Sequence, residues 1–304
     1  MKTKISFIVL LFIIIPLYIF LKGADAKMIR KPAVAGQFYP SGKEELIKMI
    51  DGFLSKANPS KLDGKLLGLI SPHAGYVYSG QVAAYSYKLL QNAKYDIVII
   101  MGNSHHMPYN YGSIYYKKDD ENYFQTPIGE VKINKAVSEE LLKNENIFKA
   151  DNNPHTYEHS IEVQIPFLQR VLKPDFEIVP ILFGTQSYEM LESAAMLIAE
   201  TIKDKNVLLI ASTDLSHYYG YEKSKEMDRV AMEAVITLNP VTLIKQVMEG
   251  KCEFCGLSGV LVEIMVAKKM GANNVQVLNA ANSGDVAGDK NKVVGYSAVV
   301  ITRK

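Results

Sequence analysis

The stretch Leu66-Leu-Gly-Leu-Ile-Ser-Pro-His-Ala-Gly75 shows the pattern that decides the fold: a short apolar run followed by a polar loop that carries a histidine. Apolar runs of this length, bounded by glycine or proline, are typical of strands buried on both faces. Further runs of the same kind lie at 96–101, 176–183, 207–211, 275–280 and 293–301. We expect each of these runs to form a buried strand.

Segments with helical periodicity lie between these runs, at 43–54, 80–91, 136–145, 158–172, 188–203, 222–236 and 257–269. Strands that alternate with helices are typical of α/β proteins. The sequence therefore predicts an α/β fold with a central, mostly parallel mixed sheet flanked by helices on both faces. Within 158–172, Pro166 cannot donate a backbone hydrogen bond, so we expect a kink there.

Residues 112–133 depart from this alternation. Two segments with strand character, 113–116 and 129–133, flank a polar stretch rich in acidic residues. This arrangement predicts a long hairpin near 112–133 that projects from the sheet.

The composition excludes some classes of protein. With 304 residues, 48% of them hydrophobic, the chain is long enough to bury a sizeable core, and no internal break divides residues 28–304. The net charge is +2 and no long run of Lys or Arg is present. Because nucleic-acid binders need a basic surface, we expect no nucleic-acid partner.

The first 27 residues have the features of a targeting segment. Lys2 and Lys4 precede an uncharged apolar run at 5–21, and an Ala-x-Ala pattern follows at 24–26. These features predict a signal peptide, with a retained membrane anchor as the alternative. Residues 1–27 thus predict an exported or membrane-anchored protein. The extracytoplasmic side is favoured, although the basic residues after the run would hold an anchored domain in the cytoplasm.

Most of the histidines follow predicted strands. The loops concerned are Ser71-Pro-His-Ala-Gly75, Gly102-Asn-Ser-His-His106 and Ser212-Thr-Asp-Leu-Ser-His217. The carboxyl ends of parallel strands form the edge of the sheet where ligands bind. We therefore expect one crevice to be lined by His73, His105, His106, Asp214 and His217.

This set of side chains is suited to a metal ion. Two imidazoles and one anionic ligand leave positions open on iron for substrate and oxygen. His73 and one histidine of the 105/106 pair would supply the nitrogens. The third ligand is either Asp214 or Cys255, whose thiolate the following helix would stabilise. The spacing does not choose between them.

Two further motifs allow more than one interpretation. Cys252 and Cys255 are the only cysteines, and they could form a disulfide, pack in the core or contribute a metal ligand. A zinc site would need a second such pair. His159 and Glu162 lie three apart at the start of a predicted helix, hence on one face, either at the site or in a solvated first turn.

Several motifs occur in an order that resembles the Memo family, which includes the B component of the AmmeMemoRadiSam system. They are Pro32-Ala-Val-Ala-Gly-Gln-Phe-Tyr-Pro40, Ser71-Pro-His-Ala-Gly-Tyr76, Gly102-Asn-Ser-His-His106, Glu158-His-Ser-Ile-Glu162, Ser212-Thr-Asp-Leu-Ser-His217 and Cys255-Gly256. The resemblance covers about residues 28–302. Family members usually begin near Met28, so the first 27 residues look like an addition.

The resemblance implies a fold similar to class III extradiol dioxygenases and a metal held by His73, His106 and Cys255. Fe(II) is the cofactor that it implies, and copper is a competitor because a thiolate is a soft ligand. The true dioxygenases have a carboxylate where this sequence has Cys255, and this departure weighs against ring cleavage.

Two functions remain open. The first is a mononuclear iron enzyme with redox or oxygenase-type activity, in which His217, Asp214 and His159 are the expected catalytic residues. His217 would act as acid or base and Asp214 would orient it. The second is a non-enzymatic module that binds a peptide or small molecule in the same pocket, since one family member is described as a phosphopeptide-binding adaptor. The family association also implies a radical-SAM partner.

Overall fold

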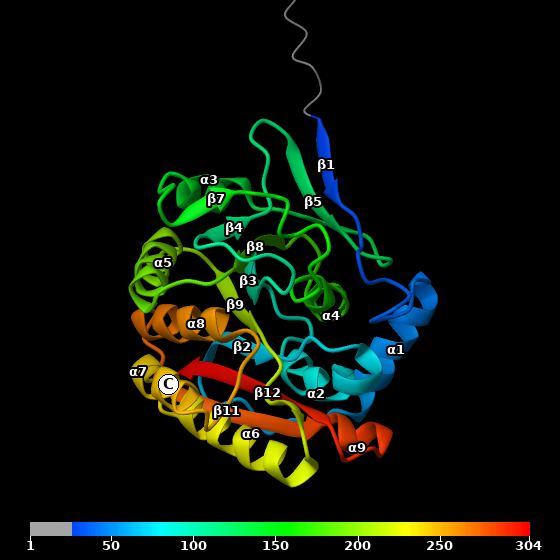
Figure 1. The fold of residues 1–304 in the computed structure, drawn as a ribbon. Coiled ribbons are helices and arrows are strands. Elements are labelled where there is room, and N and C mark those ends of the chain that lie inside the picture. Colours follow the sequence, from blue (N-terminus) through cyan, green and yellow to red (C-terminus); the bar gives the residue numbers. More distant parts are fainter. Residues whose placement is uncertain (1–25) are drawn as a thin grey trace, which may run out of the picture.

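In the computed structural model of this protein, residues 26–304 are described (Figure 1). They form a nine-stranded sheet and a smaller three-stranded sheet. The order along the large sheet is β10 (His217–Tyr219), β12 (Val293–Arg303), β2 (Lys65–Ser71), β9 (Val207–Ser212), β3 (Ile97–Asn103), β8 (Glu177–Phe183), β4 (Gly112–Ile114) and β7 (Phe148–Ala150), with β11 (Asn274–Asn282) paired to β12.

The centre of the large sheet is parallel. Strands β2, β9, β3 and β8 run in the same direction, whereas β12 and β4 pair with this group antiparallel on its two sides. All six strands predicted from apolar runs are present, with ends that differ by no more than two residues. The predicted α/β class with a mixed, mostly parallel sheet is confirmed.

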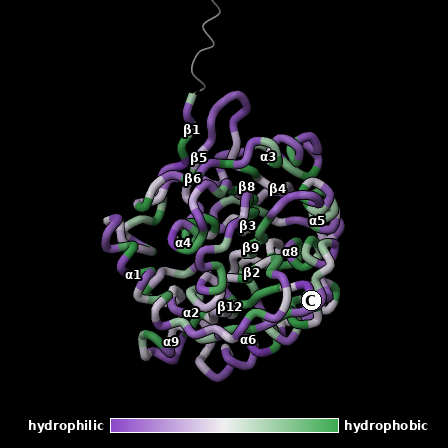
Figure 2. Tube along the Cα trace, turned by 180° about the vertical axis from the view of Figure 1, so that it is seen from behind, coloured by the Kyte–Doolittle hydropathy of each residue, from purple (hydrophilic) through white to green (hydrophobic). Residues whose placement is uncertain are grey.

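Helices cover both sides of this sheet. In Figure 1, α5 (Tyr188–Thr201), α7 (Pro240–Met248) and α8 (Leu257–Lys269) lie on one side, and α1 (Lys43–Lys56), α2 (Tyr76–Lys88) and α4 (Ile165–Val171) lie on the other. The remaining helices are α3 (Lys135–Leu142), α6 (Tyr221–Ile236) and the short α9 (Ser283–Ala287). Figure 2 shows that the central strands are mainly hydrophobic and that α6 is mainly hydrophilic on the outside. The apolar faces of sheet and helices thus share one core.

The hairpin differs from the prediction. Strands β5 (Glu121–Gln125) and β6 (Glu130–Lys132) pair antiparallel, and β1 (Lys27–Arg30) adds to β5 to make the three-stranded sheet. Residues 113–116, expected to form one arm, instead enter the large sheet through β4, which pairs with β8. Ile114 and Tyr115 are buried there, so their apolar surface gains more in the core than in an exposed hairpin.

The helix predicted over 158–172 is shorter than expected. The segment forms a 3-10 turn, η1 (Glu162–Gln164), and then α4, which has Pro166 in its first turn. At that position the missing N–H of proline costs no helical hydrogen bond, so the helix begins there and has no kink in its interior. Residues 158–160 are left outside any helix.

The predicted signal peptide or anchor of residues 1–27 falls almost wholly on residues 1–25, which lie outside the described part. Among residues 26–304, no helix is both long enough and apolar enough to cross a membrane.

Candidate metal centre

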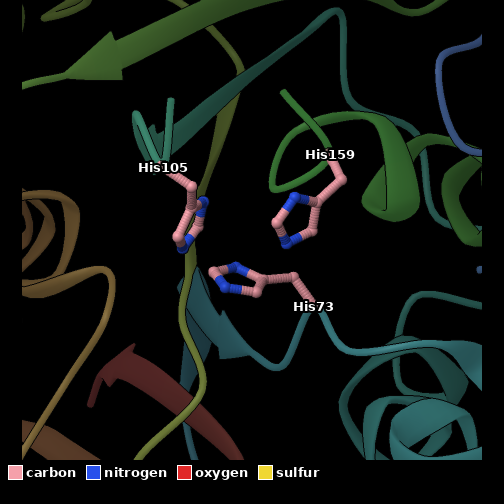
Figure 3. A group of neighbouring side chains, drawn as sticks. All are labelled: His73, His105 and His159. Atoms are coloured by element: carbon pink, nitrogen blue, oxygen red, sulfur yellow. The ribbon is translucent and has the colours of Figure 1, made fainter. Parts of the chain in front are cut away.

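Three histidines from separate parts of the chain meet beyond the carboxyl ends of β2 and β3 (Figure 3). The ring centroids of His73 and His105 are 5.1 Å apart, those of His73 and His159 are 5.2 Å apart, and those of His105 and His159 are 4.7 Å apart. One nitrogen of each ring lies within 4.8 Å of the others. The three rings form what we call the histidine cluster.

The sheet accounts for the position of this cluster. Strands β2 and β3 both flank β9 in parallel, so His73, two residues after β2, and His105, two residues after β3, reach the same edge. His159 belongs to the segment before η1, which packs closely over β3. A Cβ atom at Gly102 would clash with Ser160 Oγ, so a glycine at the end of β3 allows this approach.

Cys255 adjoins the cluster. Its Sγ lies 3.0 Å from Nε2 of His73 and accepts a hydrogen bond from the backbone N–H of Asp214 at 3.1 Å. Burial raises the pKa of Cys255, and the nearby Asp214 raises it further, so without a metal the group is a thiol. Both cysteines are free, and Cys252 is fully buried in the core. The structure therefore holds no disulfide between them.

The carboxylate of Glu158 holds two residues of the cluster, His105 and His159, in place. Its carboxylate accepts hydrogen bonds from Nδ1 of His105 at 2.9 Å and from the backbone N–H groups of His105, His159 and Ser160 at 2.7 to 2.9 Å. Burial alone would raise the pKa of Glu158, but His105 and His159 lower it overall, so the carboxylate is ionised. Since a carboxylate can only accept, Nδ1 of His105 donates and its Nε2 is left free.

The protonation of the rings differs within the cluster. Burial lowers the pKa of His73 well below its usual value and lowers that of His159 to about 4. Burial also acts to lower the pKa of His105, but Glu158 outweighs it and raises the pKa. At neutral pH, therefore, His73 and His159 are uncharged and can offer a nitrogen lone pair to an ion.

A buried ion pair holds the segment that carries His159. Glu162 pairs with Arg30 and accepts hydrogen bonds from the backbone N–H groups of Ala33 at 2.8 Å and Val34 at 3.1 Å. Arg30 also donates to the carbonyl oxygens of His155 and Glu158. One interpretation of the sequence was that Glu162 lies in a solvated first turn, on one helical face with His159. That interpretation was wrong, because Glu162 is fully buried against strand β1 and the segment that follows it.

Asp214 and His217 lie beside the cluster. Asp214 accepts a hydrogen bond from the backbone N–H of His73 at 2.8 Å, and burial raises its pKa to about 7 against the effect of backbone donors. His217 donates from Nδ1 to the carbonyl oxygen of Leu215 at 2.7 Å, which leaves its Nε2 free. The structure thus places Asp214 on the loop after β9 and His217 at the start of β10, where that loop ends.

His106, the ligand implied by the family resemblance, has a different position. His105 and His106 are both exposed, but His106 forms a second group with Glu158 and His159, whereas His105 is the member of the pair that joins His73. The role of His106 as a ligand stays a prediction. His155 is a structural histidine, with Nε2 at 3.1 Å from the carbonyl oxygen of Ser113 and a pKa that burial lowers to about 3.

Sequence reasoning missed Arg30 and Glu158 as supports of the cluster. Arg30 lies about 130 positions before its partners, so no local pattern indicates the contact. Glu158 could have been suspected, because a buried carboxylate commonly orients a histidine ligand.

Comparison with known proteins places these features in a family. The chain matches the family described as Memo-like protein over residues 30–300. A MEMO1 family protein of Nitrosopumilus maritimus is 35% identical over 277 residues, which cover 90% of this chain and 99% of the relative. One of Sulfolobus acidocaldarius is 39% identical over 285 residues, with 90% and 99% covered. One of Thermotoga neapolitana is 38% identical over 286 residues, with 90% and 100% covered. The chain belongs to the Memo-like protein family.

Proposed function

We propose that this protein binds one transition-metal ion at the histidine cluster and uses it for redox or oxygenase-type chemistry on a substrate still to be identified. The observation that supports this proposal is the meeting of three imidazoles from three separate segments, with the thiol of Cys255 only 3.0 Å from Nε2 of His73. Imidazole and thiolate ligands suit iron, copper and zinc, and iron is our first choice.

The protonation states of these side chains, as well as their positions, are suited to binding a metal ion. His73 and His159 are neutral at pH 7, and the hydrogen bond from His105 to Glu158 leaves Nε2 of His105 available. The Cys255 thiol would lose its proton when a metal binds, because a coordinating thiol is deprotonated. His106 is the alternative to His105 as third imidazole, since the two are neighbours.

A bound iron ion would supply one-electron redox chemistry and would polarise a substrate atom. The chain would contribute proton transfer. Asp214, with a pKa of about 7, can hold or release a proton near neutral pH, and Nε2 of His217 can accept one. The backbone hydrogen bond from His73 keeps the Asp214 carboxylate beside the cluster.

Metal analysis of protein purified without oxygen tests this proposal. We expect about one equivalent of iron per chain, bound metal lost in His73→Ala, and oxygen uptake by the iron-loaded wild type that is absent in that variant. Protein that binds no transition metal at any loading, while its fold is intact by circular dichroism, would contradict the proposal.

A second candidate function is capture of a peptide or small molecule without chemistry. The exposed aromatic side chains of Tyr157 and Tyr218, 74% and 70% accessible, directly neighbour Glu158 and His217 in sequence. Exposed aromatic groups beside a site commonly contact ligands. Ligand binding that survives metal removal and the Cys255→Ser substitution would favour this function over the redox enzyme.

We also propose that residues 1–27 export or anchor the protein. The basic residues and apolar run of that segment support this. N-terminal sequencing of the mature chain, together with cell fractionation, distinguishes cleavage from anchoring.

A further inference from the structure

A chain of buried hydrogen bonds lies behind His73. Tyr87 donates from its hydroxyl to Oε1 of Gln164 at 2.7 Å, and Nε2 of Gln164 donates to Oγ of Ser212 at 2.7 Å. Oγ of Ser212 lies 3.0 Å from Nδ1 of His73. All four side chains are at most 2% exposed, so water does not complete any of these contacts.

The direction of each hydrogen bond in the chain can be assigned by counting protons. Nε2 of Gln164 also donates to the carbonyl oxygen of Pro72 at 3.0 Å, and a carbonyl only accepts, so the amide can have only one orientation. Its second N–H therefore points to Ser212. Tyr87 is the donor to the amide oxygen on the other side.

Ser212 has one hydroxyl proton. Its Oγ lies 2.6 Å from the carbonyl oxygen of Ser160, and two oxygens at that distance repel each other unless a proton lies between them. The hydroxyl proton of Ser212 therefore points to the carbonyl oxygen of Ser160, and the two lone pairs of Oγ accept from Gln164 and from His73. Nδ1 of His73 must be the donor in its contact with Ser212.

We propose that Ser212 is a positioning residue that holds His73 in the Nδ1–H tautomer. The lone pair of Nε2 then faces Sγ of Cys255, the candidate thiolate ligand. In the other tautomer a proton would occupy this position and block an ion. The tautomer follows from the contacts alone, whereas its importance for metal binding rests on the proposed function.

Three distant parts of the chain meet at this hydroxyl, namely β9, the loop that carries His73, and the segment 160–164. Ser212 ends β9, Ser160 belongs to the segment that carries His159, and Gln164 is the last residue of η1. A metal-ligating histidine commonly has its second nitrogen fixed by a hydrogen bond of this kind. Here the same hydroxyl also links the segment of His159 to the strand beside His73.

Nuclear magnetic resonance of the metal-free full chain with ¹⁵N-labelled histidine tests the assignment. Long-range ¹H–¹⁵N correlations report the tautomer of each of the six histidines, and the His73 signals are identified by their loss in His73→Gln. We expect His73 to be wholly Nδ1–H in the wild type and to gain a clear Nε2–H population in Ser212→Ala. Ser86→Ala, which removes another fully buried hydroxyl that bonds to its own helix, should leave His73 unchanged.

An Nε2–H tautomer in the wild type, or an unchanged His73 in Ser212→Ala, would overturn the proposal. The wild-type measurement decides the question even if Ser212→Ala does not fold, and Ser212→Thr should retain the Nδ1–H form because it keeps the hydroxyl. As a second readout, Co²⁺ affinity should fall about tenfold in Ser212→Ala. A wild type with the expected tautomer that binds no metal would contradict the proposed function and leave the role of Ser212 standing.

Discussion

Sγ of Cys255 lies 3.0 Å from Nε2 of His73, although the two residues are 182 positions apart in the chain. The loop before α8 brings the sulfur there, and the loop after β2 brings the imidazole. Each group is a metal ligand in its own right. Their contact is the relationship on which the candidate metal centre depends.

Replacing Cys255 by serine should remove the softest ligand of the centre. Wild-type protein loaded with Co²⁺ should show a thiolate-to-metal charge-transfer band in the near ultraviolet, because Cys255 is beside the cluster. Cys255→Ser should lose this band and bind Co²⁺ at least about tenfold more weakly. Cys252→Ala is the matched control, and a band that disappears in that variant but persists in Cys255→Ser would refute the assignment.

The neighbouring histidines should differ in their effect on metal binding. His105 joins His73 and His159 and is oriented by Glu158, whereas His106 lies in the second group, with Glu158 and His159. We expect His105→Ala to reduce Co²⁺ affinity more strongly than His106→Ala in calorimetric titrations. The reverse order would support the ligand set carried over from the family resemblance and would show that the two loop residues exchange places when a metal binds.

Breaking the ion pair between Arg30 and Glu162 should destabilise the protein. Both side chains are buried, so Arg30→Met leaves the Glu162 carboxylate without its partner, at a cost of about 3–5 kcal/mol in the free energy of unfolding. Urea denaturation measures this change. The control is Arg229→Ala, since Arg229 forms its pairs with Glu226 and Glu233 on the exposed face of α6 and should matter little. Equal effects of the two substitutions would argue against a supporting role for Arg30.

Glu263 should make the stability of the protein depend on pH. This carboxyl group is fully buried on α8, so close to Gly68 that a Cβ atom there would clash with it, and burial raises its pKa well above the usual value. The folded state therefore keeps Glu263 protonated at pH values where the unfolded chain has lost the proton. Its contribution to stability is fully present below the unfolded pKa, near 4.5, and decreases as the pH rises toward the folded pKa.

The substitution Glu263→Gln isolates this effect. As the pH rises above about 4.5, the unfolding free energy of the wild type should fall relative to that of the variant, by at most about 1.4 kcal/mol per pH unit. Denaturation curves from pH 4 to pH 8 measure the difference. Glu192→Gln, an exposed residue of α5, serves as the control and should follow the wild type. If Glu263→Gln also follows the wild type, the carboxyl group is not held protonated.

Much of the architecture could be predicted from the sequence, because it follows from local patterns. The apolar runs at 66–70 and 207–211 are buried strands, since their side chains gain the most by leaving water. The polar loops after them lie at the carboxyl edge of the sheet because parallel strands end on the same side. The ordered motifs also identified the family, and the match over 30–300 confirms it.

The tertiary structure alone decided which side chains meet. Residues 112–114 pair with β8 rather than with 129–133, and Glu162 faces Arg30 rather than solvent. His105 and not His106 turns toward His73, because Glu158 binds its Nδ1. Each of these outcomes depends on a partner that is distant in sequence or on the direction of a side chain in a loop. Hydrophobic periodicity carries neither kind of information, because it reports only how strongly each residue avoids water.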